Sequence, residues 1–234
     1  MSAGDPIWTC PSCHKTYYSN IQTVCCGNVV YGLVGNTYQL PQLPQSNVGY
    51  PVRETLVVCL YGGPGSGKST TAAGVFHDLK IKGIDCELVT EFAKKLVWAK
   101  RHHTFNDQIY LFAKQYHSIF NVLGQVQVIV TDCPILLSPI YDIEKRPTLE
   151  QLIVEEHNKM WSYNVFLKRT KKYNPNGRNQ TEEESIKIDG EILDLLDKHK
   201  QAYETFEGNS DGKDGIVKKI TWLLKYKNNE RVNI

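Results

Sequence analysis

Residues 55–70, TLVVCLYGGPGSGKST, decide the fold of this chain. Their opening, TLVVCL, is apolar and rich in β-branched residues, which predicts a short buried strand. A glycine-rich turn follows, in which Gly62, four further residues and then Gly67, Lys68 and Ser69 match the pattern GxxxxGK followed by Ser or Thr. The sequence after Ser69 has a helix-compatible composition. The pattern therefore lies between a strand and a helix, the context that a phosphate-binding loop requires.

The physical chemistry of this loop predicts binding of nucleotide phosphates. Glycines let the backbone wrap tightly, so that its N–H groups point at phosphate oxygens, and the following helix adds its positive end. We expect the Lys68 ammonium to reach the β- and γ-phosphates of ATP, and the Ser69 hydroxyl to ligate the bridging Mg²⁺. The alternative is a glycine-rich turn without a ligand. The expected nucleotide-binding residues are Gly62, Gly63, Pro64, Gly65, Ser66, Gly67, Lys68, Ser69 and Thr70.

Beyond this motif, short apolar runs alternate with helix-like segments. Further strands are expected at 86–90, 126–131, 163–167 and 203–206. Helices are expected at 68–82, 91–100, 107–123, 182–200 and 216–226. This alternation predicts the α/β class, with a parallel sheet flanked by helices. We expect one main domain, residues 52–234, after a linker at 41–51 and a cysteine-rich module at 1–40.

Two acidic residues directly follow predicted strands and are expected at the site. Asp132 comes after the buried strand 126–131, where P-loop proteins place a carboxylate near the metal. Asp132 can also cap the turn before Pro134, and the two roles are compatible. Glu91 follows the strand 86–90, and a carboxylate there can receive the proton of an acceptor hydroxyl. The alternative for Glu91 is a favourable charge at a helix N-terminus.

The predicted helix 107–123 carries polar side chains suited to an acceptor. Gln108 and Gln115 are seven residues apart and therefore share one face, and Tyr116 lies beside them. These side chains can hydrogen-bond a base or a sugar. A solvated helical face or ordinary core packing would explain the same pattern.

Residues 168–180 form a polar and basic segment with a turn at NPNG. A loop of this kind can close over phosphates, exclude water and neutralise charge on the transferred group. Arg169 and Arg178 are the expected catalytic cations. A solvated basic loop and a contact to DNA phosphates are the alternatives.

Four of the seven cysteines fall in the stretch CPSCHKTYYSNIQTVCC near the N-terminus. Cys10 and Cys13 form a CxxC knuckle, and Cys25 and Cys26 follow after a spacer of eleven residues. The pattern resembles half of a zinc ribbon, in which Zn²⁺ would fold a segment too short to build its own core. We expect these four cysteines to be the zinc ligands. His14 is an alternative to one of the adjacent pair, and reduced thiols without a metal are the other interpretation.

Composition excludes several classes of protein. A chain with 41% hydrophobic and 22% charged residues is typical of a globular protein, and no apolar run approaches the roughly 20 residues that span a bilayer. The first residues lack the pattern of a secretory signal, so we expect a cytoplasmic protein with reduced thiols. The net charge of +2 is too small to indicate a nucleic-acid partner by itself. Cys59, Cys86 and Cys133 lie in or beside predicted strands and are expected to be small hydrophobic residues without a catalytic role.

Five segments, YGGPGSGKST, LVTEFAKKLV, DQIYLFAKQY, VIVTDCP and FLKRTKKYNPNGR, occur in this order. With them, the chain from Leu56 to Leu224 resembles the P-loop kinase domain of the nicotinamide riboside kinase-like family, which includes NAD-salvage proteins and related viral nucleoside and DNA kinases. Only the first of these segments is a specific motif by itself, and the others support the resemblance through their order and spacing. The resemblance implies an ATP- and Mg²⁺-dependent kinase that transfers the γ-phosphate to a hydroxyl of a nucleoside or nucleotide-type acceptor. It places Lys68, Ser69 and Asp132 at the nucleotide.

Two further functions remain open at this point. The cysteine module beside such a core also suits viral kinases that phosphorylate hydroxymethylated pyrimidines already in DNA, where basic residues would contact the backbone. An NTP-dependent switch or regulatory ATPase would use the same loop, and it would hydrolyse nucleotide slowly without phosphorylating an acceptor. The expected partners are a nucleotide and a small nucleoside acceptor, with DNA as the alternative and no membrane.

Overall fold

The computed structural model describes residues 55–170 and 181–232, with side chains up to Lys225, and the backbone of four short strands near the N-terminus. The chain divides into two compact units, Met1–Gln45 and Ser46–Ile234. The first unit contains two antiparallel pairs, β1 (Trp8–Thr9) with β2 (Thr16–Tyr17) and β3 (Thr23–Cys25) with β4 (Asn28–Val30). No helix among the described residues combines the length and the apolar character needed to cross a membrane.

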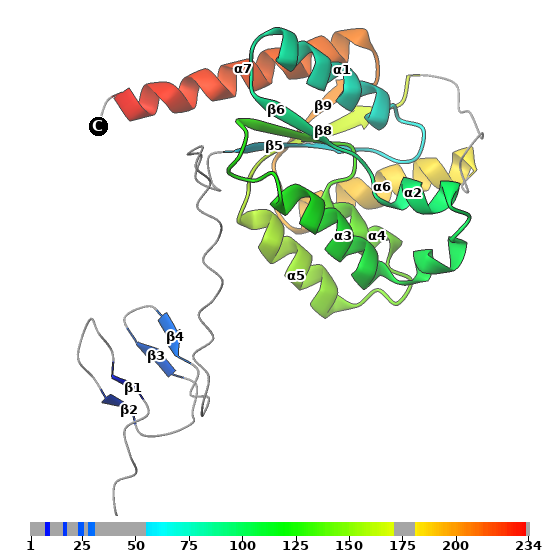
Figure 1. The fold of residues 1–234 in the computed structure, drawn as a ribbon. Coiled ribbons are helices and arrows are strands. Elements are labelled where there is room, and N and C mark those ends of the chain that lie inside the picture. The colour runs from blue at the N-terminus through cyan, green and yellow to red at the C-terminus, as the bar shows by residue number, and fades with distance from the viewer. Residues whose placement is uncertain are drawn as a thin grey trace, which may run out of the picture. The chain divides into compact units, whose positions relative to one another are not determined.

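A five-stranded sheet forms the centre of the second unit (Figure 1). Every neighbouring pair in it is parallel. In spatial order the strands are β6 (Cys86–Val89), β7 (Val128–Thr131), β5 (Leu56–Tyr61), β8 (Trp161–Lys168) and β9 (Tyr203–Glu207). The predicted α/β class with a parallel sheet flanked by helices is confirmed.

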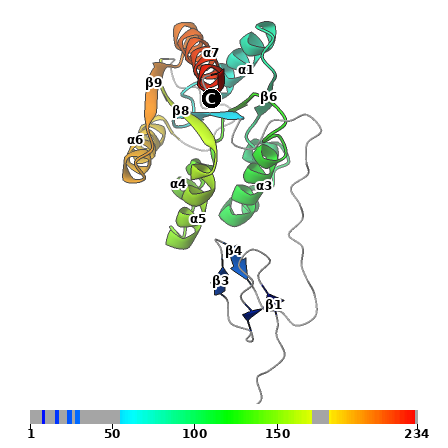
Figure 2. The ribbon, with the colours of Figure 1, turned by 90° about the vertical axis from the view of Figure 1, so that its left-hand side faces the viewer.

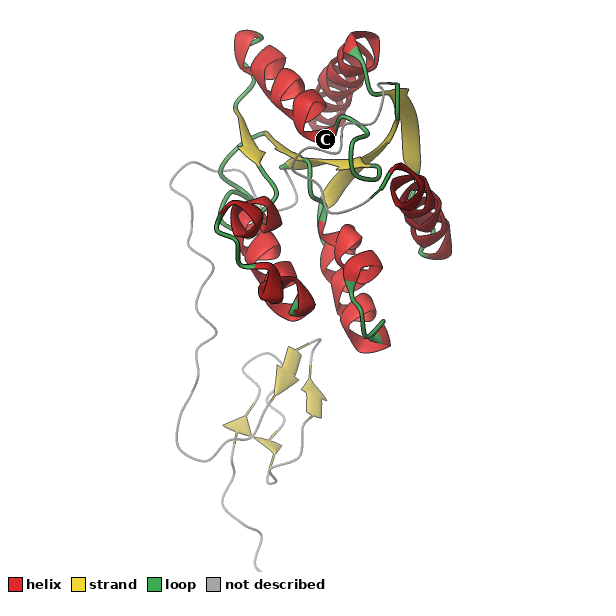
Figure 3. Ribbon diagram, turned by 90° about the vertical axis from the view of Figure 1, so that its right-hand side faces the viewer, coloured by secondary structure: helices red, strands yellow, loops and turns green. Residues whose placement is uncertain are grey.

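Helices cover both faces of this sheet (Figures 2 and 3). On one face lie α1 (Lys68–Ile81) and α7 (Ser210–Val232), and on the other lie α3 (Gln108–Phe120), α5 (Pro147–Asn158) and α6 (Glu182–Lys198). Successive residues of β5 contribute to these two cores alternately, because side chains along a strand point to opposite faces. All six residues of β5 are buried, which explains why this strand has a continuous apolar sequence.

The structure contains helices that the sequence analysis did not assign. No helix was expected between Asp132 and Tyr163, where η3 (Ile135–Leu137), α4 (Ser138–Tyr141) and α5 occur. On α5 the buried residues are Leu149, Ile153 and His157, each four positions apart. A stripe this narrow gives little helical periodicity in the sequence.

Helix α7 was expected at 216–226, but it begins at Ser210. Its first turns contain Gly212 and Gly215, which lower the intrinsic helix propensity of that segment. Tertiary packing explains the difference, because α7 lies against α1 and β9.

Candidate active site

The turn after β5 adopts the conformation expected of a phosphate-binding loop. Gly62 and Gly67 have φ angles of 139° and 99°, which side-chain-bearing residues rarely adopt. Because α1 begins at Lys68, directly after the loop, the unpaired N–H groups at its N-terminus face the loop. The Lys68 Nζ donates hydrogen bonds to the carbonyl oxygens of Gly62 at 2.5 Å and Gly63 at 3.1 Å, which hold the ammonium against the loop.

The carboxyl ends of β6 and β7 bring the two predicted acids together. The backbone N–H of Glu91 donates to the Asp132 Oδ1 at 3.0 Å. The next backbone N–H, that of Phe92, donates to the Gln115 Oε1 of α3 at 3.0 Å. Side chains from β7 and α3 therefore fix the segment that leads into α2 (Ala93–Trp98), which is shorter than the predicted helix 91–100.

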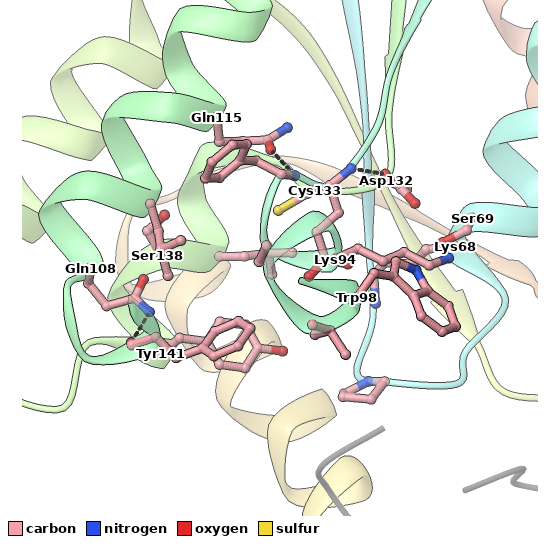
Figure 4. Close-up of a pocket in the computed structure, with 18 of the residues that line it drawn as sticks. Lys68, Ser69, Lys94, Trp98, Gln108, Gln115, Asp132, Cys133, Ser138 and Tyr141 are labelled. Atoms are coloured by element: carbon pink, nitrogen blue, oxygen red, sulfur yellow. Dashed lines mark hydrogen bonds between the residues drawn. The ribbon is translucent and has the colours of Figure 1, made fainter. Parts of the chain in front are cut away.

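A cavity of about 840 Å³ lies beside the loop (Figure 4). This volume falls within the usual range for small-molecule sites. The structure brings ten of the residues singled out from the sequence to its wall: Pro64, Gly65, Gly67, Lys68, Ser69, Thr70, Glu91, Gln108, Gln115 and Asp132. Tyr116 is not among the lining residues, and its hydroxyl donates to Glu156 of α5 at 2.8 Å.

Burial shifts the proton affinities of the charged groups at this cavity. Burial raises the pKa of Glu91, the charge of Lys68 opposes this shift, and the charge of Asp132 adds to it. Burial lowers the pKa of Lys68. Several nearby groups oppose this shift, and the charge of Glu91 opposes it most strongly. Burial also raises the pKa of Cys133 well above its ordinary value, so this thiol has little nucleophilic thiolate character. The cavity thus contains a carboxylate suited to accept a proton beside a cation.

The structure places Arg169 at the phosphate-binding loop. Its Nη1 donates to the Pro64 carbonyl oxygen at 2.5 Å, and its Nη2 donates to the Ser185 Oγ and to the Asp189 Oδ2, both at 2.9 Å. The Arg169 side chain is only 12% exposed. Arg169, directly after β8, therefore supports the loop. Among the described residues, it does not lie on a segment that closes over the site. Arg178, the other predicted cation, lies outside the described residues.

Asp189 was not singled out from the sequence, although it contacts the loop directly. It accepts a hydrogen bond from the backbone N–H of Gly63 and forms an ion pair with Arg169. Ser185 and Asp189 are four residues apart on α6 and so share one face. A Cβ atom at Gly63 would collide with the Ser185 carbonyl oxygen, so only glycine fits this contact. We refer to Arg169, Ser185 and Asp189 as the loop brace.

The predicted zinc ligands Cys10, Cys13 and Cys26 lie outside the described residues, and only the backbone of Cys25 is described. In the part of the chain that the structure describes, no group of three or more His, Cys, Asp or Glu side chains is placed to hold a metal ion. Of the other cysteines, Cys59 and Cys86 are buried as expected.

Comparison with solved structures supports the fold. The chain is similar to a crystal structure of NadR protein in complex with NR, with a TM-score of 0.53 and 15% sequence identity. The similarity covers 66% of this chain and 46% of that one, so this chain spans about half the length of that protein. At this level of identity the similarity shows the fold alone.

A structure of deoxyadenosine kinase from M. mycoides with bound products is also similar. Its TM-score is 0.42 and its identity 17%, over 74% of this chain and 99% of that one, which is too distant a match to support an argument. No protein-family model matches the sequence, and the search of curated proteins gives no match.

The loop brace predicts a measurable coupling between Arg169 and Asp189. A double-mutant cycle with Arg169→Met and Asp189→Asn, followed by denaturant unfolding, is expected to give an interaction energy of about 1–3 kcal/mol, because the two side chains are largely buried. The exposed pair Lys187–Glu191, whose charged atoms are 3.7 Å apart, is the control and should give no more than about 0.5 kcal/mol. Equal coupling in the two pairs would show that the brace does not stabilise the loop.

Proposed function

We propose that this protein is an ATP- and Mg²⁺-dependent kinase that transfers the γ-phosphate to a hydroxyl group of a nucleoside-type acceptor. One observation carries the proposal. The phosphate-binding loop with Lys68, the carboxylate of Asp132 and the carboxylate of Glu91 all line one cavity that is large enough for a second small molecule. The similarity of the fold to NadR, solved with NR bound, agrees with this assignment.

The residues of the loop fit the phosphates of ATP. The N–H groups at the start of α1 and the Lys68 ammonium supply positive charge where the phosphates would lie. Ser69 and Asp132 line the same cavity and are the proposed oxygen ligands of Mg²⁺, which usually takes one or two protein oxygens besides phosphates and water. When bound, the metal ion would neutralise charge on the phosphates. The loop brace would keep the loop in its binding conformation.

Glu91 is the proposed general base. Its carboxylate would accept the proton of the acceptor hydroxyl while the hydroxyl oxygen forms a bond to the γ-phosphorus. The bond between that phosphorus and the β–γ bridging oxygen breaks, and ADP leaves. Glu91 and Lys68 line the same cavity, and the charge of each shifts the pKa of the other, so the proposed base lies near the cation expected to contact the phosphates.

The part of the cavity around Gln115 suits a base or a sugar. Gln115 uses its Oε1 to accept from Phe92, and its buried Nε2 has no hydrogen-bond partner among the described residues. An unpaired buried donor is costly, so a ligand acceptor would satisfy it. Phe92, Leu111 and Tyr141 line the same cavity and supply apolar surface for a planar ring.

The direct test is transfer of radiolabelled γ-phosphate from ATP with Mg²⁺ to a panel of free nucleosides that includes nicotinamide riboside. Labelled product is expected with the wild-type chain, and Lys68→Ala is expected to abolish it. Lys82→Ala, which removes an exposed lysine at the end of α1, should retain full transfer. Lys68-dependent phosphate release with no labelled acceptor would contradict the proposal and indicate a nucleotide-driven switch.

The raised pKa of Glu91 predicts how the transfer rate depends on pH. Transfer needs the carboxylate, so the rate should fall as the pH drops through the Glu91 pKa, which burial places above the ordinary range for glutamate. Glu91→Gln should reduce kcat about a hundredfold or more and should remove this acidic limb. An unchanged acidic limb in Glu91→Gln would assign the titration to another group.

We also propose that Cys10, Cys13, Cys25 and Cys26 bind a structural zinc ion. The knuckle spacing supports this assignment. The purified chain is expected to contain about one equivalent of zinc by elemental analysis, and Cys10→Ser with Cys13→Ser should remove it. A metal-free wild-type chain that keeps the same fold and activity would rule the site out.

A further inference from the structure

The segment between Glu91 and Asp107 has an unusual distribution of charge. Residues 92–106, FAKKLVWAKRHHTFN, contain four lysine or arginine residues and two histidines, but no aspartate or glutamate. They form α2 and η2 (His102–Asn106). All six basic side chains are exposed. We call Lys94, Lys95, Trp98, Lys100, Arg101, His102 and His103 the α2–η2 surface.

These cations differ from six other lysines of the described protein, which pair with carboxylates. They are Lys80, Lys159, Lys187, Lys198, Lys213 and Lys219. No ion pair involves Lys94, Lys95, Lys100 or Arg101 among the residues that the structure describes. An ordinary solvated face carries both signs of charge. A face of one sign attracts a polyanion.

An aromatic side chain stands in the middle of this surface. Trp98 is 75% exposed, and single exposed apolar residues are common on proteins. Trp98, however, lines the same cavity as Ser69 and Glu91, together with Lys94 and His102 (Figure 4). Ile143, which is 71% exposed, lines this cavity as well. The basic surface is therefore continuous with the wall of the candidate active site.

We propose that the α2–η2 surface binds the backbone of a single-stranded polynucleotide and presents one of its nucleotides to the cavity as the acceptor. This inference rests on the proposed kinase function and names its acceptor class. Basic side chains would contact phosphates, and the exposed indole would stack on a base, the combination used by proteins that bind single strands. A base in a duplex is already stacked and paired, so a single strand fits the exposed indole better.

The test measures binding of fluorescein-labelled single-stranded oligonucleotides of about 12 nucleotides, DNA and RNA in separate arms, to the full chain by anisotropy at several salt concentrations. The double variant Lys100→Gln/Arg101→Gln removes two cations that do not line the cavity. If both contact phosphates, the salt slope should fall by about 1.4, since each contact to a single strand contributes about 0.7. Trp98→Ala should weaken binding at least about fivefold, and Trp98→Phe should restore part of the loss.

The matched control is Lys82→Gln/Lys218→Gln, which removes two exposed cations outside this surface. It should bind like the wild type. Equal binding by the two double variants, or a wild-type chain that binds neither oligonucleotide, would overturn the inference.

A second readout separates this inference from the proposed function. In the phosphate-transfer assay, Lys100→Gln/Arg101→Gln should lower transfer to a nucleotide within an oligonucleotide more than transfer to free nucleosides. Transfer to free nucleosides without any oligonucleotide binding would overturn the inference that the α2–η2 surface binds a polynucleotide. It would leave the proposed kinase function unaffected. Surface-dependent binding without transfer to any acceptor would instead contradict the kinase assignment.

Discussion

The parallel pairing of β6, β7 and β5 is the constraint on which the site depends. Thr131 of β7 lies opposite both Cys59 of β5 and Val89 of β6. The three strands therefore end at the same edge of the sheet. The glycine-rich loop follows β5 there, Glu91 follows β6 and Asp132 follows β7. A shift of one residue in either pairing would displace a functional group by about 3.3 Å and turn its side chain to the other face. The hydrogen bond from Glu91 N–H to Asp132 at 3.0 Å then ties two of these strand ends together.

A loop rich in glycine needs support, because glycine loses the most conformational freedom on folding. The structure supplies this support from behind the loop. Arg169 at the end of β8 and Asp189 on α6 hold Pro64 and Gly63 respectively, while α1 continues directly from the other end. The loop is thus held at both ends, so its N–H groups would need little further ordering to bind phosphates as proposed. In such sites, fixed dipoles cost no reorganisation when the ligand arrives.

Local signals in the sequence predicted much of this arrangement. The strand, loop and helix around Lys68 and the positions of Glu91 and Asp132 follow from patterns only a few residues long. Asp189 could not be found in this way, since it is one acid among many on a charged helix and gains its role only through contact with Gly63. For Arg169 the sequence placed a cation near the site, but its function depends on the Asp189 partner. Trp98 was not singled out from the sequence, although an aromatic residue within a basic segment without acids is a pattern that indicates nucleic-acid binding.

The proposed kinase function requires that this loop binds the phosphates of ATP inside the cavity that also receives the acceptor. Calorimetric titration of a non-hydrolysable ATP analogue with Mg²⁺ into the full chain tests it most directly, with Lys68→Ala measured in parallel. One binding event is expected in the wild-type chain, and it should weaken at least about tenfold without Lys68, because the lost group would contact charged phosphates. Binding that is absent, or that is equally strong in both proteins, would contradict it.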